Sequence, residues 1–198
     1  MTSLYQDPSL QDTESLEVLP IHHHEQFFEP CCKLINSEWK RSDTARMWSL
    51  KASCDQFPTS LVLVYKKCEV VGHARMTLIP SLVSACFIES VVIDTNHRRK
   101  GWGKYLMFKT EEYALCQNII SLYLATKGQE EFYRKLGYSE CPSVSIYGSP
   151  PLCPQKPNII SSYIAPPAPP MPSLLPKTNI NQFSKPKKTY MKKDIILI

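Results

Sequence analysis

The segment 98–104 holds the residues whose types and spacing best suit chemistry, because it combines cations with two glycines. Its members are Arg98, Arg99, Lys100, Gly101, Trp102, Gly103 and Lys104. Glycine lets the main chain approach a ligand closely, and N–H groups at a helix start attract anions. Guanidinium and ammonium groups add charge that suits phosphates. The segment therefore predicts a phosphate-binding turn, with an exposed strand-to-helix connection as the alternative.

Two elements must position this turn. Before it, the apolar stretch 88–93 predicts a buried strand. After it, a 3.6-residue period predicts a helix. Its apolar face consists of Leu106, Met107, Thr110, Tyr113, Ala114 and Gln117, and its opposite face of Lys104, Glu111 and Glu112. A strand, a basic turn and a helix start together form the expected anion site.

The spacing excludes two common phosphate motifs. A Walker loop requires glycine five residues before its Gly-Lys pair, where this chain has Arg98. A dinucleotide fingerprint requires a third glycine three residues after Gly103, where Leu106 stands. The pattern that remains is Arg-x-x-Gly-x-Gly.

A second motif lies downstream. Residues 119–126 predict a strand, and residues 128–136 predict a short helix that Gly137 should end. The helix contains Phe132 and Tyr133, and Tyr138 follows the glycine, so the pattern is Phe-Tyr-x-x-x-Gly-Tyr. Taken alone, these aromatic residues could simply belong to the core.

Together, the two motifs resemble those of the GNAT acetyltransferase superfamily. The resemblance implies an α/β fold in which helices flank a mixed, mostly antiparallel sheet. It implies acetyl-CoA as cofactor, with the pyrophosphate on residues 98–104. It places the pantetheine arm on the main chain of Val91, Val92 and Ile93, and further cofactor contacts at Thr126 and Gln129. Tyr133 matches the tyrosine that protonates the departing thiolate.

Length and composition describe an ordinary globular protein. The chain has 198 residues, 43% of them hydrophobic and 21% charged, and a net charge of +5, which suits one well-buried domain. No zinc-finger spacing or basic stripe with interleaved aromatic residues indicates nucleic acid. No signal peptide or membrane-spanning run is apparent, so we expect a cytoplasmic protein that binds no membrane. The run His22–His24 is expected to be solvated, and no metal is assigned.

The chain divides into three parts. Residues 1–16 are polar and predict a flexible N-terminus. Residues 17–147 and 188–198 should form the acetyltransferase domain, in which 143–147 and 189–197 supply the last two strands. Residues 148–187 hold most of the prolines and predict a Pro-rich loop inserted before the last strand. A disordered tail is the alternative, but its apolar end would favour aggregation.

The first half predicts elements that complete the GNAT order. A strand is expected over 16–21, and helical segments over 30–39 and 45–51. A hairpin is expected to join strands 61–65 and 70–78 near Lys66 and Lys67, and 86–93 forms the next strand. The resulting order is strand, helices, three strands, helix, strand, helix.

Acetyl transfer to an amine requires that the amine be neutral. An α-amino group, with a pKa of about 7.7–8.0, needs less help from a base than lysine, at about 10.4. Glu89, on the strand before the turn, and His73, on the neighbouring strand, are the candidate bases. For each of them a structural role is the alternative.

Residues 39–50 suggest a substrate. The segment places Trp39 beside Lys40, Arg41 and Arg46, a composition that suits an acidic chain end. The alternative is a solvated helix end with Trp39 in the core.

Three further stretches resemble the actin N-terminal acetyltransferases, a family within this superfamily. They are Trp-x-Arg-Ser at 39–42, Gly-His-Ala-Arg at 72–75 and the Pro-rich segment. The resemblance implies acetylation of the acidic N-terminus of processed actin and binding of profilin through the Pro-rich loop. It assigns the peptide contacts to Trp39, Arg41, Thr44, Arg46 and Met47. A GNAT enzyme for a small-molecule or lysine amine and a non-catalytic adaptor for profilin are the alternatives.

Overall fold

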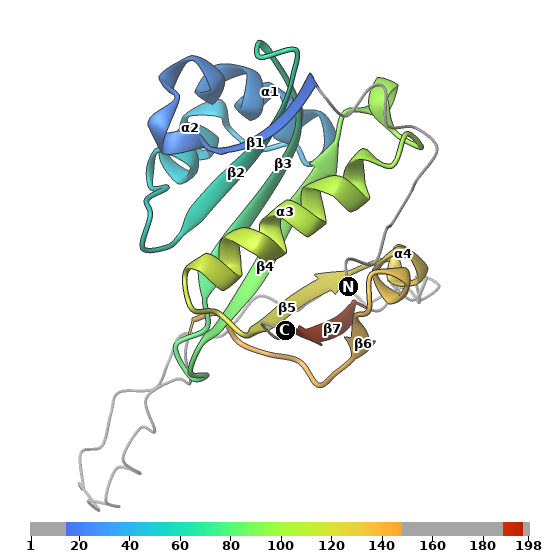
Figure 1. Ribbon diagram of the computed structural model, residues 1–198. Coiled ribbons are helices and arrows are strands. Elements are labelled where there is room, and N and C mark those ends of the chain that lie inside the picture. Colours follow the sequence, from blue (N-terminus) through green and yellow to red (C-terminus); the bar gives the residue numbers. More distant parts are fainter. Residues whose placement is uncertain (1–14, 148–187, 196–198) are drawn as a thin grey trace, which may run out of the picture.

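Helices cover both faces of a single sheet in this protein (Figure 1). The computed structural model describes residues 15–147 and 188–195. Within these residues the sheet has seven strands. Their bounds are Leu16–Pro20 (β1), Thr59–Tyr65 (β2), Glu69–Leu78 (β3), Ala85–Ile93 (β4), Ser121–Thr126 (β5), Ser139–Glu140 (β6) and Thr189–Asp194 (β7).

The helices are distributed over the two faces, with α1 and α2 on one side and α3 on the other (Figure 1). The α-helices are Phe28–Glu38 (α1), Asp43–Lys51 (α2), Trp102–Cys116 (α3) and Glu130–Lys135 (α4). Short 3-10 helices are Ile21–His23 (η2), Glu25–Phe27 (η3) and Thr95–His97 (η4). None of the described helices is both long and apolar enough to span a membrane.

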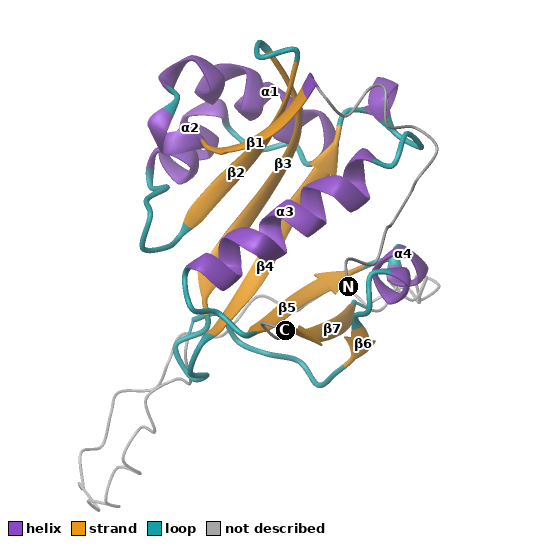
Figure 2. Cartoon of the chain, in the orientation of Figure 1, coloured by secondary structure: helices purple, strands orange, loops and turns teal. Residues whose placement is uncertain are grey.

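The strand order is β1-β2-β3-β4-β5-β7-β6. Strands β4 and β5 run parallel, and every other neighbouring pair is antiparallel. A parallel pair needs a crossover, which α3 provides. The segment near the C-terminus enters the sheet between β5 and β6 (Figure 2). The mixed, mostly antiparallel sheet expected from the sequence is therefore confirmed.

Local signals in the sequence explain several element ends. Lys66 and Lys67 both adopt positive φ angles, 49° and 60°, which allows the tight turn expected between β2 and β3. Gly137 has a φ of 89°, a conformation that favours glycine, and it follows α4 at the expected place. The helix itself is shorter than residues 128–136.

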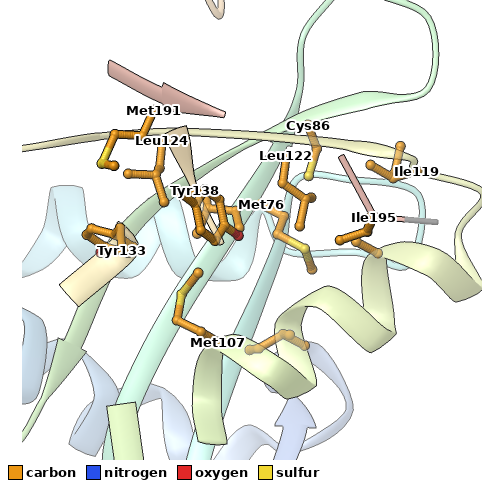
Figure 3. Close-up of a cluster of buried hydrophobic side chains, with 13 residues drawn as sticks. Met76, Cys86, Met107, Ile119, Leu122, Leu124, Tyr133, Tyr138, Met191 and Ile195 are labelled. Atoms are coloured by element: carbon orange, nitrogen blue, oxygen red, sulfur yellow. The ribbon is translucent and has the colours of Figure 1, made fainter. Parts of the chain in front are cut away.

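One large apolar cluster lies between α3 and the sheet (Figure 3). It joins Met107 of α3 to Leu124 of β5 and Met191 of β7. The sequence placed Glu111 on the solvent side of this helix, and this is wrong. Glu111 is 9% exposed, and its carboxylate lies 2.6 Å from Nζ of Lys193 on β7. A close partner of opposite charge, the partly buried Lys193, explains why a carboxylate can occupy the inner face.

The strand predicted over Ser143–Tyr147 is also wrong. The short strand β6 lies earlier, at Ser139–Glu140, where it pairs with β7. Val144 and Ile146 instead pack against the apolar cluster of Ile79, Ala85 and Phe87 without joining the ladder. Their alternation with polar residues therefore reflects packing on the sheet. The predicted Pro-rich loop at 148–187 and most of the flexible N-terminus at 1–16 lie outside the described residues.

Strand β4 contains a β-bulge that divides it in two. His73 of β3 is opposite Val92, whereas Arg75 is opposite Glu89, so three steps along β4 match two along β3. At this point Ser90 adopts a φ of 55°. The extra residue reverses the faces: Ile88 packs with Met107 of α3, but Val92 packs with residues of α1. In a regular strand these two side chains would share a face.

A buried histidine holds the bulge. Nδ1 of His73 lies 2.9 Å from the carbonyl oxygen of Ser90, which can only accept, so Nδ1 carries the proton. Nε2 is buried and has no hydrogen-bond partner among the described residues. Burial lowers the pKa of His73 to about 4. The ring is therefore neutral at physiological pH and acts as a donor to the bulge.

Lowering the pH should destabilise the fold through His73. Its pKa is below the ordinary value of about 6.5, so between pH 6.5 and 4 the unfolded chain binds the extra proton. The stabilisation is complete above about pH 6.5 and is lost as the pH falls to about 4, a change of about 3 kcal/mol at most. Urea denaturation at pH 7.0 and 5.0 measures it.

The variant His73→Gln keeps an N–H donor for Ser90 but cannot titrate, so it should lose less stability than wild type over this window. His24→Gln is the matched control, because the His24 ring lies only partly buried beside Phe27. Equal pH dependence in all three proteins would contradict the assignment.

Candidate active site

The bulge leaves part of β4 without a partner on the side of β5. Pairing between the two parallel strands runs from Ala85 to Ile88 and stops there. Beyond it, no described strand pairs with β4 on this side, and β5 diverges from it (Figure 1). Val91, Val92 and Ile93, the expected cofactor contacts, lie in this unpaired stretch. Unpaired strand main chain is able to bind an extended ligand by β-strand addition.

The start of α3 lies directly after this stretch. Gly101 precedes the helix with a φ of 80°, and a Cβ atom there would meet no atom within 4 Å. No side chain caps the helix, and its first turn contains no acidic residue. The first-turn N–H groups of a helix lack intrahelical acceptors and carry partial positive charge. This helix start therefore suits an anion.

Two residues expected at the phosphate site are used within the protein. Nη2 of Arg98 lies 2.7 Å from Oε2 of Glu38, at the end of α1, and its Nε donates to the Ile93 carbonyl at 3.0 Å. The Trp102 side chain is 3% exposed and stacks on His97 at 4.7 Å. Arg98 therefore anchors the turn to α1 and β4, and Trp102 anchors it to the core.

Other cations of the turn face solvent. Arg99, Lys100 and Lys104 are all exposed, and Nζ of Lys100 lies 5.1 Å from the centre of the Trp102 ring. Arg99 has a φ of 65°, which turns the chain between η4 and α3. These three side chains surround the helix start with positive charge.

The end of β5 carries two further expected cofactor contacts. Thr126 is buried and pairs with Thr189 of β7, whereas Gln129 is exposed and precedes α4. The Phe132 ring of α4 approaches α3, since a Cβ on Gly103 would lie 3.5 Å from it and 3.7 Å from Ile93. Strand β4, α3 and α4 therefore meet at Gly103.

Tyr133 extends from α4 into the large apolar cluster (Figure 3). Its ring meets Phe132 and Tyr138 edge-on, at 5.0 and 5.9 Å. Burial raises the pKa of Tyr133 to about 12. The hydroxyl therefore stays protonated at neutral pH and is able to donate a proton or a hydrogen bond.

Glu89 lies just before the bulge, on the face covered by α2. One of its oxygens is 3.4 Å from both Nε of Arg75 and Oγ1 of Thr77. Nη1 of Arg75 in turn donates to the Ser49 carbonyl of α2 at 2.7 Å. With about a third of its side chain exposed, Glu89 is able to accept a proton from a ligand. His73 is a poorer base because it is buried and its pKa is about 4.

The connection between α1 and α2 is built around Arg46. Its Nη2 donates to the Trp39 carbonyl at 2.9 Å, and its Nε donates to Oδ1 of Asn36 at 3.0 Å. Asn36 also donates to the Arg41 carbonyl and to Asp43. Arg46, expected to contact the substrate, is therefore largely occupied in holding the end of α1. Its pKa is lowered by burial and by the nearby charge of Arg41.

The other expected substrate residues are more accessible. Arg41 and Thr44 are exposed, and Met47 is partly buried against the apolar cluster that contains Leu34 and Ile35 of α1. Trp39 is 45% exposed, so the alternative that placed it in the core is wrong. Arg41 forms no ion pair with another described residue.

Two residues of this region were missed in the sequence. Trp48 is 72% exposed on α2, whereas Leu50 on the same helix is buried. Trp48 could have been found in the sequence, because it is an aromatic residue that lies outside the apolar face of a short helix. Arg75 was quoted only as part of a motif, yet its partly buried guanidinium links Glu89 to α2. No local pattern indicates such a contact between distant residues.

Two comparisons with known proteins concern the sequence. The profile described as "Acetyltransferase (GNAT) family" matches residues 21–138. N-alpha-acetyltransferase 80 of Mus musculus is 34% identical over 119 residues, which cover 57% of this chain and 38% of that protein. The chain thus matches well under half the length of this relative.

Solved structures share the fold. A GNAT-family acetyltransferase from Staphylococcus aureus has a TM-score of 0.58 at 14% identity. The superposition covers 91% of this chain and 99% of the S. aureus chain. One from Streptococcus pneumoniae has a TM-score of 0.58 at 13% identity, with the same coverage. Identities this low show the fold alone. Since the family profile covers more than half of the sequence, the chain belongs to the acetyltransferase (GNAT) family.

Proposed function

We propose that this protein is an N-alpha-acetyltransferase that uses acetyl-CoA to acetylate acidic protein N-termini, those of processed actin in particular. The observation that carries the proposal is the unpaired stretch of β4 directly before an uncapped, glycine-initiated helix start. One segment of chain thus offers main-chain groups for an extended arm and N–H groups for phosphates.

The cofactor would be held by three sets of groups. The main chain of residues 91–93 would bind the pantetheine arm, and the N–H groups at the start of α3 the pyrophosphate. Arg99, Lys100 and Lys104 would contribute charge, while Arg98 fixes the turn through Glu38 and Ile93. Thr126 and Gln129 would approach it from the end of β5. Bound acetyl-CoA would supply the acetyl group as a thioester.

Two side chains would move the protons. Glu89 would accept a proton from the incoming amine, directly or through water, because it is partly exposed at the bulge. Tyr133 would donate to the leaving sulfur, because burial keeps it protonated. An α-amino group, with an ordinary pKa of about 7.7–8.0, needs only a modest base. His73 would position the bulge.

The acceptor peptide would lie beside α1 and α2. Lys40 and Arg41 are exposed there without an ion pair to any described residue, and Trp39 and Trp48 present aromatic surface. An acidic N-terminus would complement this charge. Thr44 and Met47 would add contacts, and Arg46 would hold their helix in place. The name of the mouse relative, N-alpha-acetyltransferase 80, supports an α-amino acceptor.

Actin as substrate and profilin as partner rest on the resemblance of the sequence. The stretch Ala165–Pro172 contains the Pro-Pro-x-Pro-Pro pattern that aromatic surfaces bind as polyproline II helix. We extend the proposal to profilin binding through this segment and to a cytoplasmic location. Titrating profilin into the full chain, with Pro169→Ala and Pro170→Ala variants, tests the partner.

A peptide panel tests the proposed function. Purified protein and acetyl-CoA are incubated with peptides that begin Asp-Asp-Asp, Glu-Glu-Glu, Met-Leu or Ser-Gly, and with an N-blocked peptide that contains lysine. We expect the acidic free N-termini to have the highest kcat/KM. Activity on lysine alone would support a different acceptor, and acetyl-CoA binding without turnover would support the adaptor.

Removing one hydroxyl should separate chemistry from binding. Tyr133→Phe should lower kcat by about 10²-fold or more, since general acid catalysis typically contributes that much. Affinity for acetyl-CoA, measured by calorimetry, should stay within about twofold. Tyr138→Phe is the matched control, because it removes the hydroxyl of another buried tyrosine in the same apolar cluster. Equal losses in the two variants would contradict a catalytic role for Tyr133.

Reversing a single charge should change peptide preference. Arg41→Glu should raise KM for acidic peptides by about tenfold, equivalent to about 1.4 kcal/mol, and leave neutral peptides nearly unaffected. Lys51→Glu makes the same charge change at the C-terminal end of α2, whereas Arg41 precedes the helix, and it should have a smaller effect. The proposed acceptor site would be wrong if the two variants behaved alike in steady-state kinetics.

A further inference from the structure

Two histidines and an aspartate that are distant in sequence meet outside the candidate active site. His22 and His23 belong to η2, between β1 and α1, and Asp55 lies in the connection from α2 to β2. Nε2 of His22 is 2.9 Å from Oδ1 of Asp55, and Nε2 of His23 is 3.6 Å from Oδ2. One nitrogen or oxygen atom from each of the three lies within 4.8 Å of the other two.

These separations suit a small divalent ion. Zinc binds imidazole nitrogen and carboxylate oxygen at about 2.0–2.2 Å, which places neighbouring ligand atoms about 3.3 Å apart in a tetrahedron. The two separations, 2.9 Å from His22 to Oδ1 of Asp55 and 3.6 Å from His23 to Oδ2, lie on either side of that value. His23 and Asp55 are more than half exposed, so small side-chain rotations suffice.

His22, the most buried of the three residues, is held in its orientation by a contact on its other ring nitrogen. Nδ1 of His22 lies 2.9 Å from Oγ of Ser53, a residue that is only 6% exposed. The same Oγ accepts a hydrogen bond from the main-chain N–H of Ser60, at 2.9 Å. Metal-binding histidines commonly have their second nitrogen fixed in this way. This contact is independent of the cluster itself and directs Nε2 toward Asp55.

We propose that His22, His23 and Asp55 form a binding site for a divalent transition metal, zinc in particular. Two imidazoles and one carboxylate match zinc, and solvent would complete the coordination. On binding, Nε2 of His22 gives up its hydrogen bond to Asp55 and coordinates the ion, while Nδ1 carries the proton and donates to Ser53. Without metal, Nε2–H donates to Asp55, and the cluster only ties η2 to the loop.

The position of the site gives the metal a structural effect. One side of the cluster lies just before α1 and the other just after α2. The ion would therefore connect the entry to this helix pair with its exit, and it would stabilise the folded chain by binding it in preference to the unfolded one. This inference does not depend on the proposed function.

Metal titration of the tag-free full chain tests the site. The probe is Zn²⁺ in calorimetry, with Co²⁺ as a visible reporter of nitrogen and oxygen ligands. We expect one ion per chain at this site, a rise in Tm on saturation, and weaker binding at lower pH because imidazole must be deprotonated to coordinate. Asp55→Ala and His23→Ala should each weaken binding by at least tenfold.

Matched controls exclude other sources of binding. His24→Ala removes the adjacent histidine, whose ring centre lies 5.7 Å from that of Phe27. His24 is not a member of the cluster, so this variant should bind Zn²⁺ like wild type. His23→Ala leaves the His22 contact with Ser53 in place, so its folding is expected to be retained. Absence of Zn²⁺ and Co²⁺ binding by wild type would overturn the proposal. So would Asp55→Ala and His23→Ala variants that bind Zn²⁺ as tightly as wild type, or a Co²⁺ spectrum typical of thiolate ligands.

Discussion

The bulge at Ser90 is the constraint on which the rest of the site depends. A regular β4 would keep Ile88 and Val92 on one face, whereas here they pack against α3 and α1 respectively. The same irregularity coincides with the end of pairing to β5, which leaves the strand edge unpaired at residues 89–93. A serine with positive φ is unfavourable by itself, so its surroundings must stabilise it. The buried hydrogen bond from His73 to its carbonyl supplies part of that stabilisation.

Several arginines in this protein connect secondary-structure elements instead of being available to bind ligands. Arg98 joins the basic turn to α1 and β4, Arg46 joins α2 to the end of α1, and Arg75 joins β3 to α2. The guanidinium group suits this role because it offers several donors in fixed directions. The helix pair, the basic turn and the β-bulge are consequently linked by hydrogen bonds and ion pairs. In the proposed enzyme, the cations that contact ligands would be mainly lysines, together with the exposed Arg41 and Arg99.

Much of the fold follows from local patterns in the sequence. The strand before the turn, the glycine turn and the helix after it depend on residues close together in the chain, such as Gly101 and Leu106. The bulge does not, because nothing in Glu-Ser-Val-Val indicates which strand or histidine will meet Ser90. Glu111 was misplaced for a similar reason, since its partner Lys193 comes from β7. The roles of Arg98 and Arg46 likewise depend on contacts that spacing cannot reveal.

The two proposed proton-transfer residues lie toward opposite faces of the sheet. Glu89 is joined through Arg75 to α2, whereas Tyr133 packs with Met107 of α3. A continuous ladder between β4 and β5 would separate them, because hydrogen-bonded main chain would fill the space between. The pairing instead ends at Ile88, immediately before Glu89. A thioester held along the unpaired strand could therefore meet an amine from one face and the tyrosine hydroxyl from the other. The break in the sheet thus contributes to the proposed chemistry as directly as either side chain.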